Sequence, residues 1–116
     1  MKRRALLAFV LCGGALHAAP SSEEQARIER LITTVGAMNQ VQFIRNGKAY
    51  NAEQAARFLR GKLKASTEQV HSVRDFIDHV ATRSSTTGKP YLMRFPDGNE
   101  MPCAEFLNAE LAKARD

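Results

Sequence analysis

The sequence predicts a single α+β domain in which four helices pack on short antiparallel β-hairpins. A chain of 116 residues has room for one domain, and its 44% hydrophobic and 25% charged residues are typical of a globular protein. Four segments carry apolar residues at helical spacing. Two short strand-like runs are each followed by a turn rich in asparagine and glycine, which is typical of a β-hairpin.

The first residues differ from the rest and predict a signal peptide over residues 1–18. Lys2-Arg3-Arg4 is a basic leader, and the apolar run from Ala5 to Leu16 is too short to anchor the chain in a bilayer. Cleavage after Ala18 leaves a small residue at the scissile position. We therefore expect a periplasmic protein, exported as residues 19–116, with no stable membrane anchor after cleavage.

Removal of this leader changes both the charge and the cysteine count. Three cations leave with it, so the formal net charge falls from +5 to 14 − 12 = +2. Nucleic-acid binding normally shows a basic face or stripe, so no nucleic-acid partner is expected. Cys12 is lost, and Cys103 then has no internal disulfide partner. We interpret Cys103 as a small buried hydrophobe, with a disulfide between molecules as the alternative.

The first half of the domain should be a helix followed by a hairpin. A hydroxyl of Ser21 or Ser22, three residues before Glu24 and Gln25, should cap the helix, and Gly36 is a natural end for it. A short strand from Val41 to Arg45 and another from Lys48 to Tyr50 flank Asn46-Gly47. This dipeptide tolerates positive φ and is the strongest turn signal in the chain.

Two further helices should follow the hairpin. Asn51 and Gln54 form a capping pair at the start of the second helix, which should end before Ser66. Gly61 costs this helix about 1 kcal/mol relative to alanine, so its last turn should be weak. Ser72 is placed to cap the third helix.

The chain should end in a second hairpin and a fourth helix. Tyr91 to Phe95 alternate as a half-buried strand would, and Pro96-Asp97-Gly98-Asn99 is a turn. Pro102 suits the first turn of the last helix, where its missing N–H costs nothing. The core face of that helix is formed by Phe106, Leu107 and Leu111.

A connection dense in hydroxyls, residues 82–91, precedes the second hairpin. A phosphate-binding P-loop does not fit, because Arg83 stands where the motif needs glycine and Pro90 where it needs a hydroxyl. No Gly-x-Ser-x-Gly elbow surrounds Ser84 or Ser85 either. One interpretation is structural: the hydroxyls satisfy the end of a helix and the following turns through local hydrogen bonds.

The other interpretation is an anion site, because hydroxyls, loop amides and flanking cations can surround an oxyanion. The first β-hairpin would contribute if the two hairpins pack edge to edge. The candidate ligand-binding residues are Arg45, Asn46, Arg83, Ser84, Ser85, Thr87 and Lys89. We therefore expect a non-catalytic binding or interaction module, without a cofactor, for an anionic envelope ligand or a periplasmic protein partner.

Catalysis and metal binding are the alternatives. A small hydrolase or transferase could use a hydroxyl of residues 82–91, but it needs a base nearby, and His79 is the nearest histidine in sequence. His71, Asp75 and His79 stand four residues apart, which suggests a metal site on a helix. A cap at Ser72 would leave His71 outside that helix, so no metal site is expected.

Three stretches resemble the small exported YfeK-like proteins of Gram-negative bacteria. They are Phe43-Ile44-Arg45-Asn46-Gly47, Arg83-Ser84-Ser85 and Thr87-Gly88-Lys89-Pro90-Tyr91, and the likeness runs from about Glu23 to Leu111. This group is a domain family of unknown function. The resemblance implies a periplasmic protein with a signal peptide, and it implies no activity.

Two positions depart from the pattern of that family. Phe58 stands where relatives have a histidine in the second helix, and Phe106 stands where many have a tryptophan in the last helix. Chemistry that used such a histidine is therefore not expected here.

Overall fold

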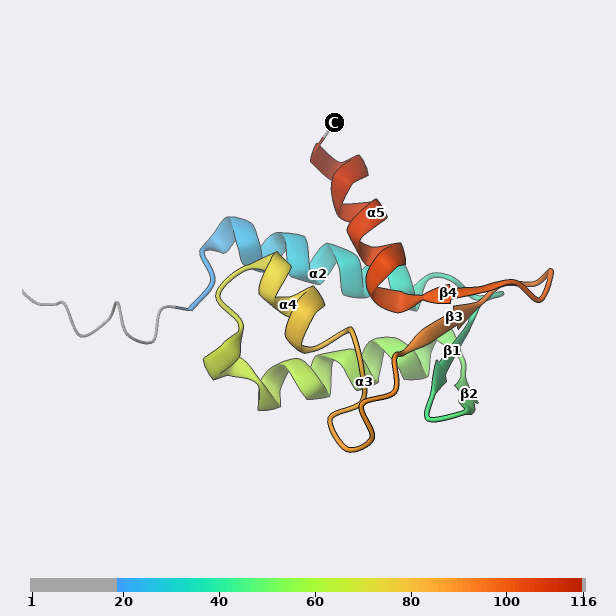
Figure 1. Ribbon diagram of the computed structural model, residues 1–116. Coiled ribbons are helices and arrows are strands. Elements are labelled where there is room, and N and C mark those ends of the chain that lie inside the picture. The colour runs from blue at the N-terminus through green and yellow to red at the C-terminus, as the bar shows by residue number, and fades with distance from the viewer. Residues whose placement is uncertain (1–18, 116) are drawn as a thin grey trace, which may run out of the picture.

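The computed structural model describes residues 19–115, which form four α-helices and a four-stranded antiparallel sheet (Figure 1). The predicted α+β class is confirmed, whereas the predicted signal peptide lies outside the described residues. In chain order the elements are α2 (Ser22–Gly36), β1 (Gln42–Arg45), β2 (Lys48–Tyr50), α3 (Ala52–Ala65), the 3-10 helix η3 (Thr67–Gln69), α4 (Val73–His79), β3 (Leu92–Arg94), β4 (Glu100–Pro102) and α5 (Cys103–Arg115).

The two hairpins form one sheet with the strand order β2-β1-β3-β4. Phe43 of β1 pairs with Met93 of β3, and Ile44 pairs with Leu92, all antiparallel. Phe43 and Ile44 are both buried, although neighbouring residues of a strand point to opposite faces. Both faces of β1 are therefore covered, and the edge-to-edge pairing of the hairpins is the feature that joins the two halves of the chain.

The first hairpin has the predicted turn. Asn46 and Gly47 both adopt positive φ, 52° and 80°, as a type I′ turn requires. The turn makes Arg45 the partner of Lys48 in the ladder. The first strand starts one residue later than expected, at Gln42.

The predicted helix starts are confirmed by their capping hydrogen bonds. The Ser21 hydroxyl accepts from the Glu24 amide, and the Ser72 hydroxyl accepts from the Asp75 amide. Asn51 and Gln54 make both bonds of a capping box at the start of α3. Helix α3 then continues through Gly61 to Ala65, so this glycine does not interrupt the helix.

The second hairpin differs in detail from the prediction. Strand β3 covers only Leu92 to Arg94, because the Tyr91 amide leaves the ladder and donates to the Thr82 carbonyl oxygen at 3.0 Å. Pro102 is the last residue of β4, where it pairs with Leu92, and α5 starts only at Cys103. The expected place for Pro102 was therefore wrong by one residue. Strand β4 is an edge strand, where a missing N–H is tolerated.

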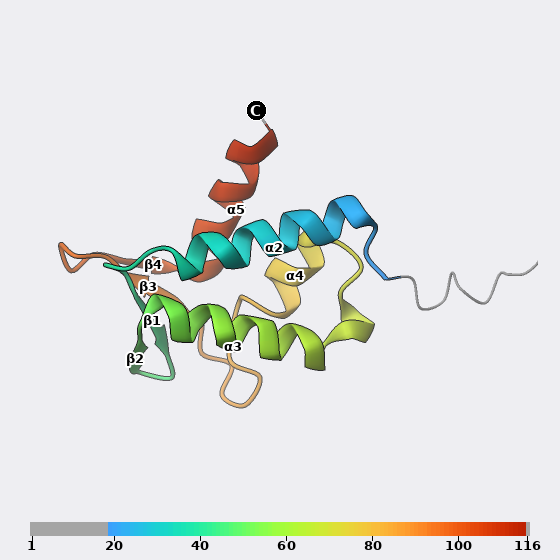
Figure 2. The ribbon, with the colours of Figure 1, turned by 180° about the vertical axis from the view of Figure 1, so that it is seen from behind.

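Helices α2 and α3 lie side by side with α4 against them, and the sheet stands at one end of this helical layer (Figure 1 and Figure 2). Residues 82–91 form a loop that extends beside α3 in both views. The core lies between the helices and the sheet. Its completely buried side chains include Ile32, Leu59, Phe76, Ile77 and Leu107.

Cys103 belongs to this core, as the sequence predicts. Its side chain is 0% exposed, and burial raises the pKa of the thiol to about 12. A neutral, enclosed thiol of this kind has no surface from which to reach another molecule while the domain is folded. Within residues 19–115, no helix is both long and apolar enough to span a membrane.

Candidate functional site

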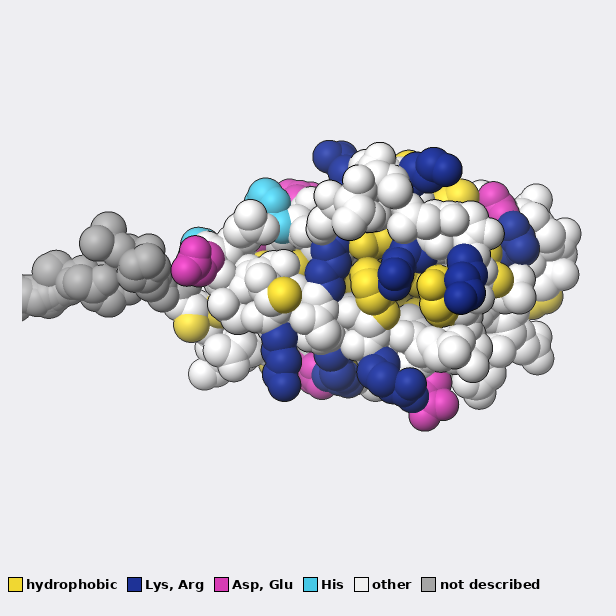
Figure 3. Space-filling model, turned by 90° about the horizontal axis from the view of Figure 1, so that it is seen from below, with side chains coloured by type: hydrophobic (Ala, Val, Ile, Leu, Met, Phe, Trp, Pro, Cys, Tyr) yellow, Lys and Arg dark blue, Asp and Glu magenta, His cyan; other side chains and the backbone are white. Residues whose placement is uncertain are grey.

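A surface pocket of about 390 Å³ opens where the first hairpin, α3 and the hydroxyl-rich loop (residues 82–91) meet. Figure 3 shows this side of the molecule from below, where Lys and Arg side chains gather with hydrophobic side chains exposed between them. We call this hollow the cationic pocket. It is lined by Arg45 and Asn46 from the hairpin, by Phe58, Gly61 and Lys62 from α3, and by Ser84, Ser85, Thr86 and Tyr91.

Backbone pairing brings these distant segments together. The β1–β3 ladder places the Asn46 turn beside the chain that leads into β3. Arg83 and Pro90 form an antiparallel bridge at the base of the loop, and the Ser84 amide donates to the Lys89 carbonyl oxygen at 2.9 Å. The loop is therefore closed on itself and held against the first hairpin.

Ser84 is the residue around which the hydroxyl-rich loop folds. It is only 5% exposed, and its Oγ accepts from the amides of Thr86 and Thr87, each at 3.3 Å. The same oxygen lies 3.0 Å from the Thr86 hydroxyl and accepts from the Asn46 side-chain amide at 3.3 Å. The Ser84 hydroxyl therefore stabilises the loop through local hydrogen bonds, as the structural interpretation of the sequence predicts.

Thr87 ties the loop to the Asn46 turn. Its hydroxyl donates to the Asn46 Oδ1 at 2.6 Å and accepts from the Lys89 amide at 3.2 Å. Asn46 therefore contacts both Ser84 and Thr87, and these three predicted site residues form one hydrogen-bonded group.

The other predicted residues divide between the pocket and its surroundings. Arg45 and Ser85 line the cationic pocket. Arg83 and Lys89 are exposed and do not line it. Of these three candidate cations, only Arg45 is part of the pocket lining. The second cation of the pocket is Lys62, which the sequence places at a helix end where a charge on the dipole explains it equally well.

Aromatic rings form the wall of the pocket. The Tyr91 ring is 1% exposed, and its centre lies 5.3 Å from that of Phe43 and 5.6 Å from that of Phe58. The Phe58–Tyr91 pair meets edge to face, an arrangement favoured by the ring quadrupoles. Phe58 is half-buried, so part of its side chain is exposed at the pocket.

Lys62 reaches across this wall to the loop. Its ammonium donates to the Arg83 carbonyl oxygen at 2.7 Å and to the Tyr91 hydroxyl oxygen at 2.8 Å. Burial lowers the pKa of Lys62, and the nearby Arg45 guanidinium lowers it further. Burial raises the pKa of the Tyr91 hydroxyl, so at neutral pH this group is a neutral partner for the ammonium.

The Arg45 guanidinium makes cation–π contacts with aromatic rings and no ion pair with a described acidic residue. Its guanidinium carbon lies 4.3 Å from the centre of the Phe58 ring and 5.4 Å from that of Tyr50. Among the described residues, neither Arg45 nor Lys62 forms an ion pair with a carboxylate. The cationic pocket therefore has two positive charges and no acidic residue in its lining.

Sequence reasoning missed five of the lining residues, namely Phe58, Gly61, Lys62, Thr86 and Tyr91. A signal for two of them was present, because Phe58 and Lys62 stand four residues apart and must share a face of α3. What the spacing could not reveal is that this face turns toward the loop, since that depends on the β1–β3 pairing.

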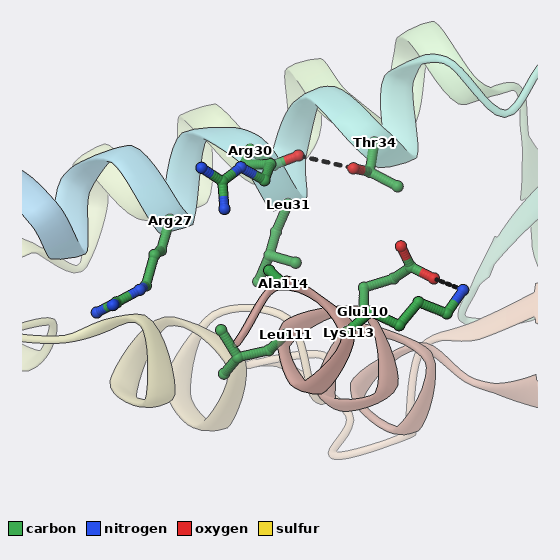
Figure 4. Close-up of a pocket in the computed structure, with 8 residues that line it drawn as sticks. All are labelled: Arg27, Arg30, Leu31, Thr34, Glu110, Leu111, Lys113 and Ala114. Carbon is green, nitrogen blue, oxygen red and sulfur yellow. Dashed lines mark hydrogen bonds and ion pairs between the residues drawn. The ribbon is translucent and has the colours of Figure 1, made fainter. Parts of the chain in front are cut away.

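A second hollow lies between α2 and α5 and contrasts with the cationic pocket (Figure 4). It measures about 200 Å³, and two of its three cations are paired with carboxylates, while the third, Arg30, is exposed. Arg27 pairs with Glu24, and Lys113 lies 3.0 Å from Glu110. The second hollow therefore provides less unpaired positive charge for an anion than the cationic pocket does.

The predicted alternatives can be compared with the same geometry. Within residues 19–115, no group of three acidic, histidine or cysteine side chains could hold a metal ion. His71 lies outside α4, where its amide donates to the Asp75 carboxylate at 2.9 Å. No serine or threonine hydroxyl of the loop is hydrogen-bonded to a histidine, a carboxylate or an amine among the described residues. These hydroxyls therefore have no base beside them of the kind that an activated nucleophile requires.

The fold and this site define a small α+β domain, and comparison places it in a family. A model described as a family of unknown function, DUF5329, matches residues 22–115, so the chain belongs to that family. The uncharacterized protein YfeK of Salmonella typhimurium is 39% identical over 71 residues, which are 61% of this chain and 59% of that protein. The resemblance seen in the sequence is therefore confirmed. No solved structure matches the chain.

Replacing Ser84 should destabilise the domain, whereas replacing its neighbour should not. Ser84→Ala leaves two loop amides and the Asn46 side chain without their acceptor, so we expect a loss of about 1–2 kcal/mol in the free energy of unfolding. Ser85→Ala removes an exposed hydroxyl and should change it by less than about 0.5 kcal/mol. Urea denaturation of both variants measures the difference. Equal effects would contradict the structural role of Ser84.

Proposed function

We propose that this protein is an exported binding module, without catalytic activity, whose cationic pocket holds an anionic group. The ligand is a small envelope anion or an acidic group on a periplasmic protein. Arg45 and Lys62 supply the charge, and the hydroxyl-rich loop fixes the rim of the site.

One observation carries this proposal: two half-buried cations share one pocket that has no carboxylate in its lining. Exposed cations without partners are ordinary, because water screens them. Burial lowers the pKa of Lys62, and repulsion between the like charges of Lys62 and Arg45 lowers it further. An anion bound between them would remove this repulsion, so the free pocket favours occupation by negative charge.

The available hydrogen-bond donors support the same proposal. Lys62 uses two of its N–H groups on the loop and the Tyr91 hydroxyl and keeps one donor for a ligand. The Arg45 side chain makes no hydrogen bond with the described residues, and its ring contacts leave the planar edge of the guanidinium available. A guanidinium edge fits phosphate and carboxylate oxygens in a bidentate manner.

Export rests on the sequence of residues 1–18. The basic leader and short apolar run are typical of a secretory signal peptide. The mature domain, residues 19–116, would reach the periplasm.

Substitution of either pocket cation should weaken anion binding. We expect Arg45→Gln and Lys62→Met each to reduce the affinity for inorganic phosphate by about tenfold or more, because each removes a charge-assisted hydrogen bond. Titrations followed by amide NMR shifts at low ionic strength measure this. The matched control is Lys64→Met, which removes an exposed cation of the same helix outside the pocket lining.

Arg83→Ala and Lys89→Ala test the two candidate cations that lie outside the pocket lining. Both residues are exposed outside the lining, so their effect should be smaller and should fade as salt is added. Absence of phosphate binding by the parent, or equal losses in the Lys64→Met control, would contradict the proposal.

Export can be measured directly. Full-length protein expressed in a Gram-negative host should be recovered from the periplasmic fraction with Ala19 as its first residue, and mass spectrometry of the intact protein identifies that end. Recovery of the uncleaved chain from the cytoplasm would contradict the export proposal and leave the binding proposal untouched.

A further inference from the structure

Gly61 is placed in the interior of α3 for no reason that the fold itself supplies. Glycine weakens a helix interior relative to alanine. It is helical and does not adopt the left-handed conformation that would favour glycine. A Cβ atom built there would meet no atom outside the local helix within 4 Å, so no close packing excludes a side chain. The one structural role left for this residue is as part of the pocket lining.

An absent side chain at this position exposes the helix backbone beside an aromatic ring. Phe58 stands one turn before Gly61 and shares its side of α3. Phe58 is half-buried, and apolar atoms make up most of the exposed surface in the pocket, although many of the lining residues are polar. The backbone N–H groups of a helix interior are already used in the helix. This part of the pocket therefore offers contact area and no hydrogen bonds.

The polar part of the pocket suits a doubly charged group. Arg45 and Lys62 contribute two positive charges, and no acid in the lining offsets them. A phosphate monoester carries nearly two negative charges at neutral pH and has three terminal oxygens as acceptors. A carboxylate would neutralise only one of the two cations.

We propose that the cationic pocket binds an organic phosphate monoester, with its phosphate at Arg45 and Lys62 and its apolar ring or chain over Gly61 against Phe58. This inference rests on the proposed function and specifies the ligand class of the same site. A volume of about 390 Å³ lies within the usual range of pockets for small organic ligands. Gly61 determines specificity, because it leaves room for the apolar part.

Phenyl phosphate, inorganic phosphate and benzyl alcohol separate the two parts of the ligand. The parent should bind phenyl phosphate about tenfold or more tightly than inorganic phosphate, because the ring leaves water for the apolar wall. Benzyl alcohol, which carries no charge, should bind more weakly than either anion. Calorimetric or NMR titration of the purified protein measures the three affinities.

Gly61→Ala and Gly61→Leu test the place of the apolar part. Both side chains favour a helix, so both variants should keep or raise the melting temperature while the pocket fills. Affinity for phenyl phosphate should fall with side-chain size, by about tenfold for leucine, while affinity for inorganic phosphate should change little. The matched control is Lys64→Leu, an exposed position of α3 outside the lining, which should alter neither affinity beyond its small charge effect.

The same chemistry occurs in soluble esters and in lipid headgroups. Sedimentation with phosphatidylcholine vesicles, with and without phosphatidate, distinguishes these sources. If phenyl phosphate binds, added binding to the vesicles that contain phosphatidate, and not to phosphatidylcholine alone, would assign the lipid, whereas no vesicle binding would assign a soluble ester.

Two results would overturn the inference. One is equal affinity of the parent for phenyl and inorganic phosphate. The other is a Gly61→Leu variant that binds phenyl phosphate as the parent does. In both cases inorganic phosphate still binds, so the proposed anion site would stand. If neither anion binds, both the inference and the proposed function fail.

Discussion

The pairing of β1 with β3 is the interaction on which the rest of the structure depends. It joins two hairpins that lie about fifty residues apart and builds one sheet with β1 in its interior. Arg45 and Asn46 are thereby brought to the hydroxyl-rich loop, and Phe43 is packed against the Tyr91 ring at 5.3 Å. Loss of this pairing would separate the site into residues without a common surface.

Much of the fold could be predicted because its signals are local. The cap at Ser21, the capping box at Asn51 and the positive φ of the Asn46-Gly47 turn each depend on a few neighbouring residues. The errors occur where distant contacts decide. Tyr91 lies outside the strand because its amide donates to the Thr82 carbonyl oxygen. Pro102 belongs to β4 because it pairs with Leu92 in the β3–β4 ladder.

In the candidate site, too, local features could be predicted and those that depend on distant contacts could not. A turn dense in hydroxyls could be recognised in the sequence; its structural interpretation agrees with the hydrogen bonds, and its interpretation as an anion site stays a proposal. Ser84 and Thr87 build the loop, while the charge at the pocket comes from Arg45 together with Lys62. Lys62 could not be assigned from sequence, because a cation near the end of a helix is sufficiently explained by the helix dipole.

The proposed anion site requires that Arg45 and Lys62 occupy one partly desolvated space without an acid between them. An NMR titration of the Lys62 side-chain amine, in the parent and in Arg45→Gln, tests it most directly. The pKa of Lys62 should lie below the usual lysine value in the parent and should rise when the guanidinium is removed, since Arg45 disfavours the charged amine. An ordinary or raised pKa that Arg45→Gln leaves unchanged would contradict the account.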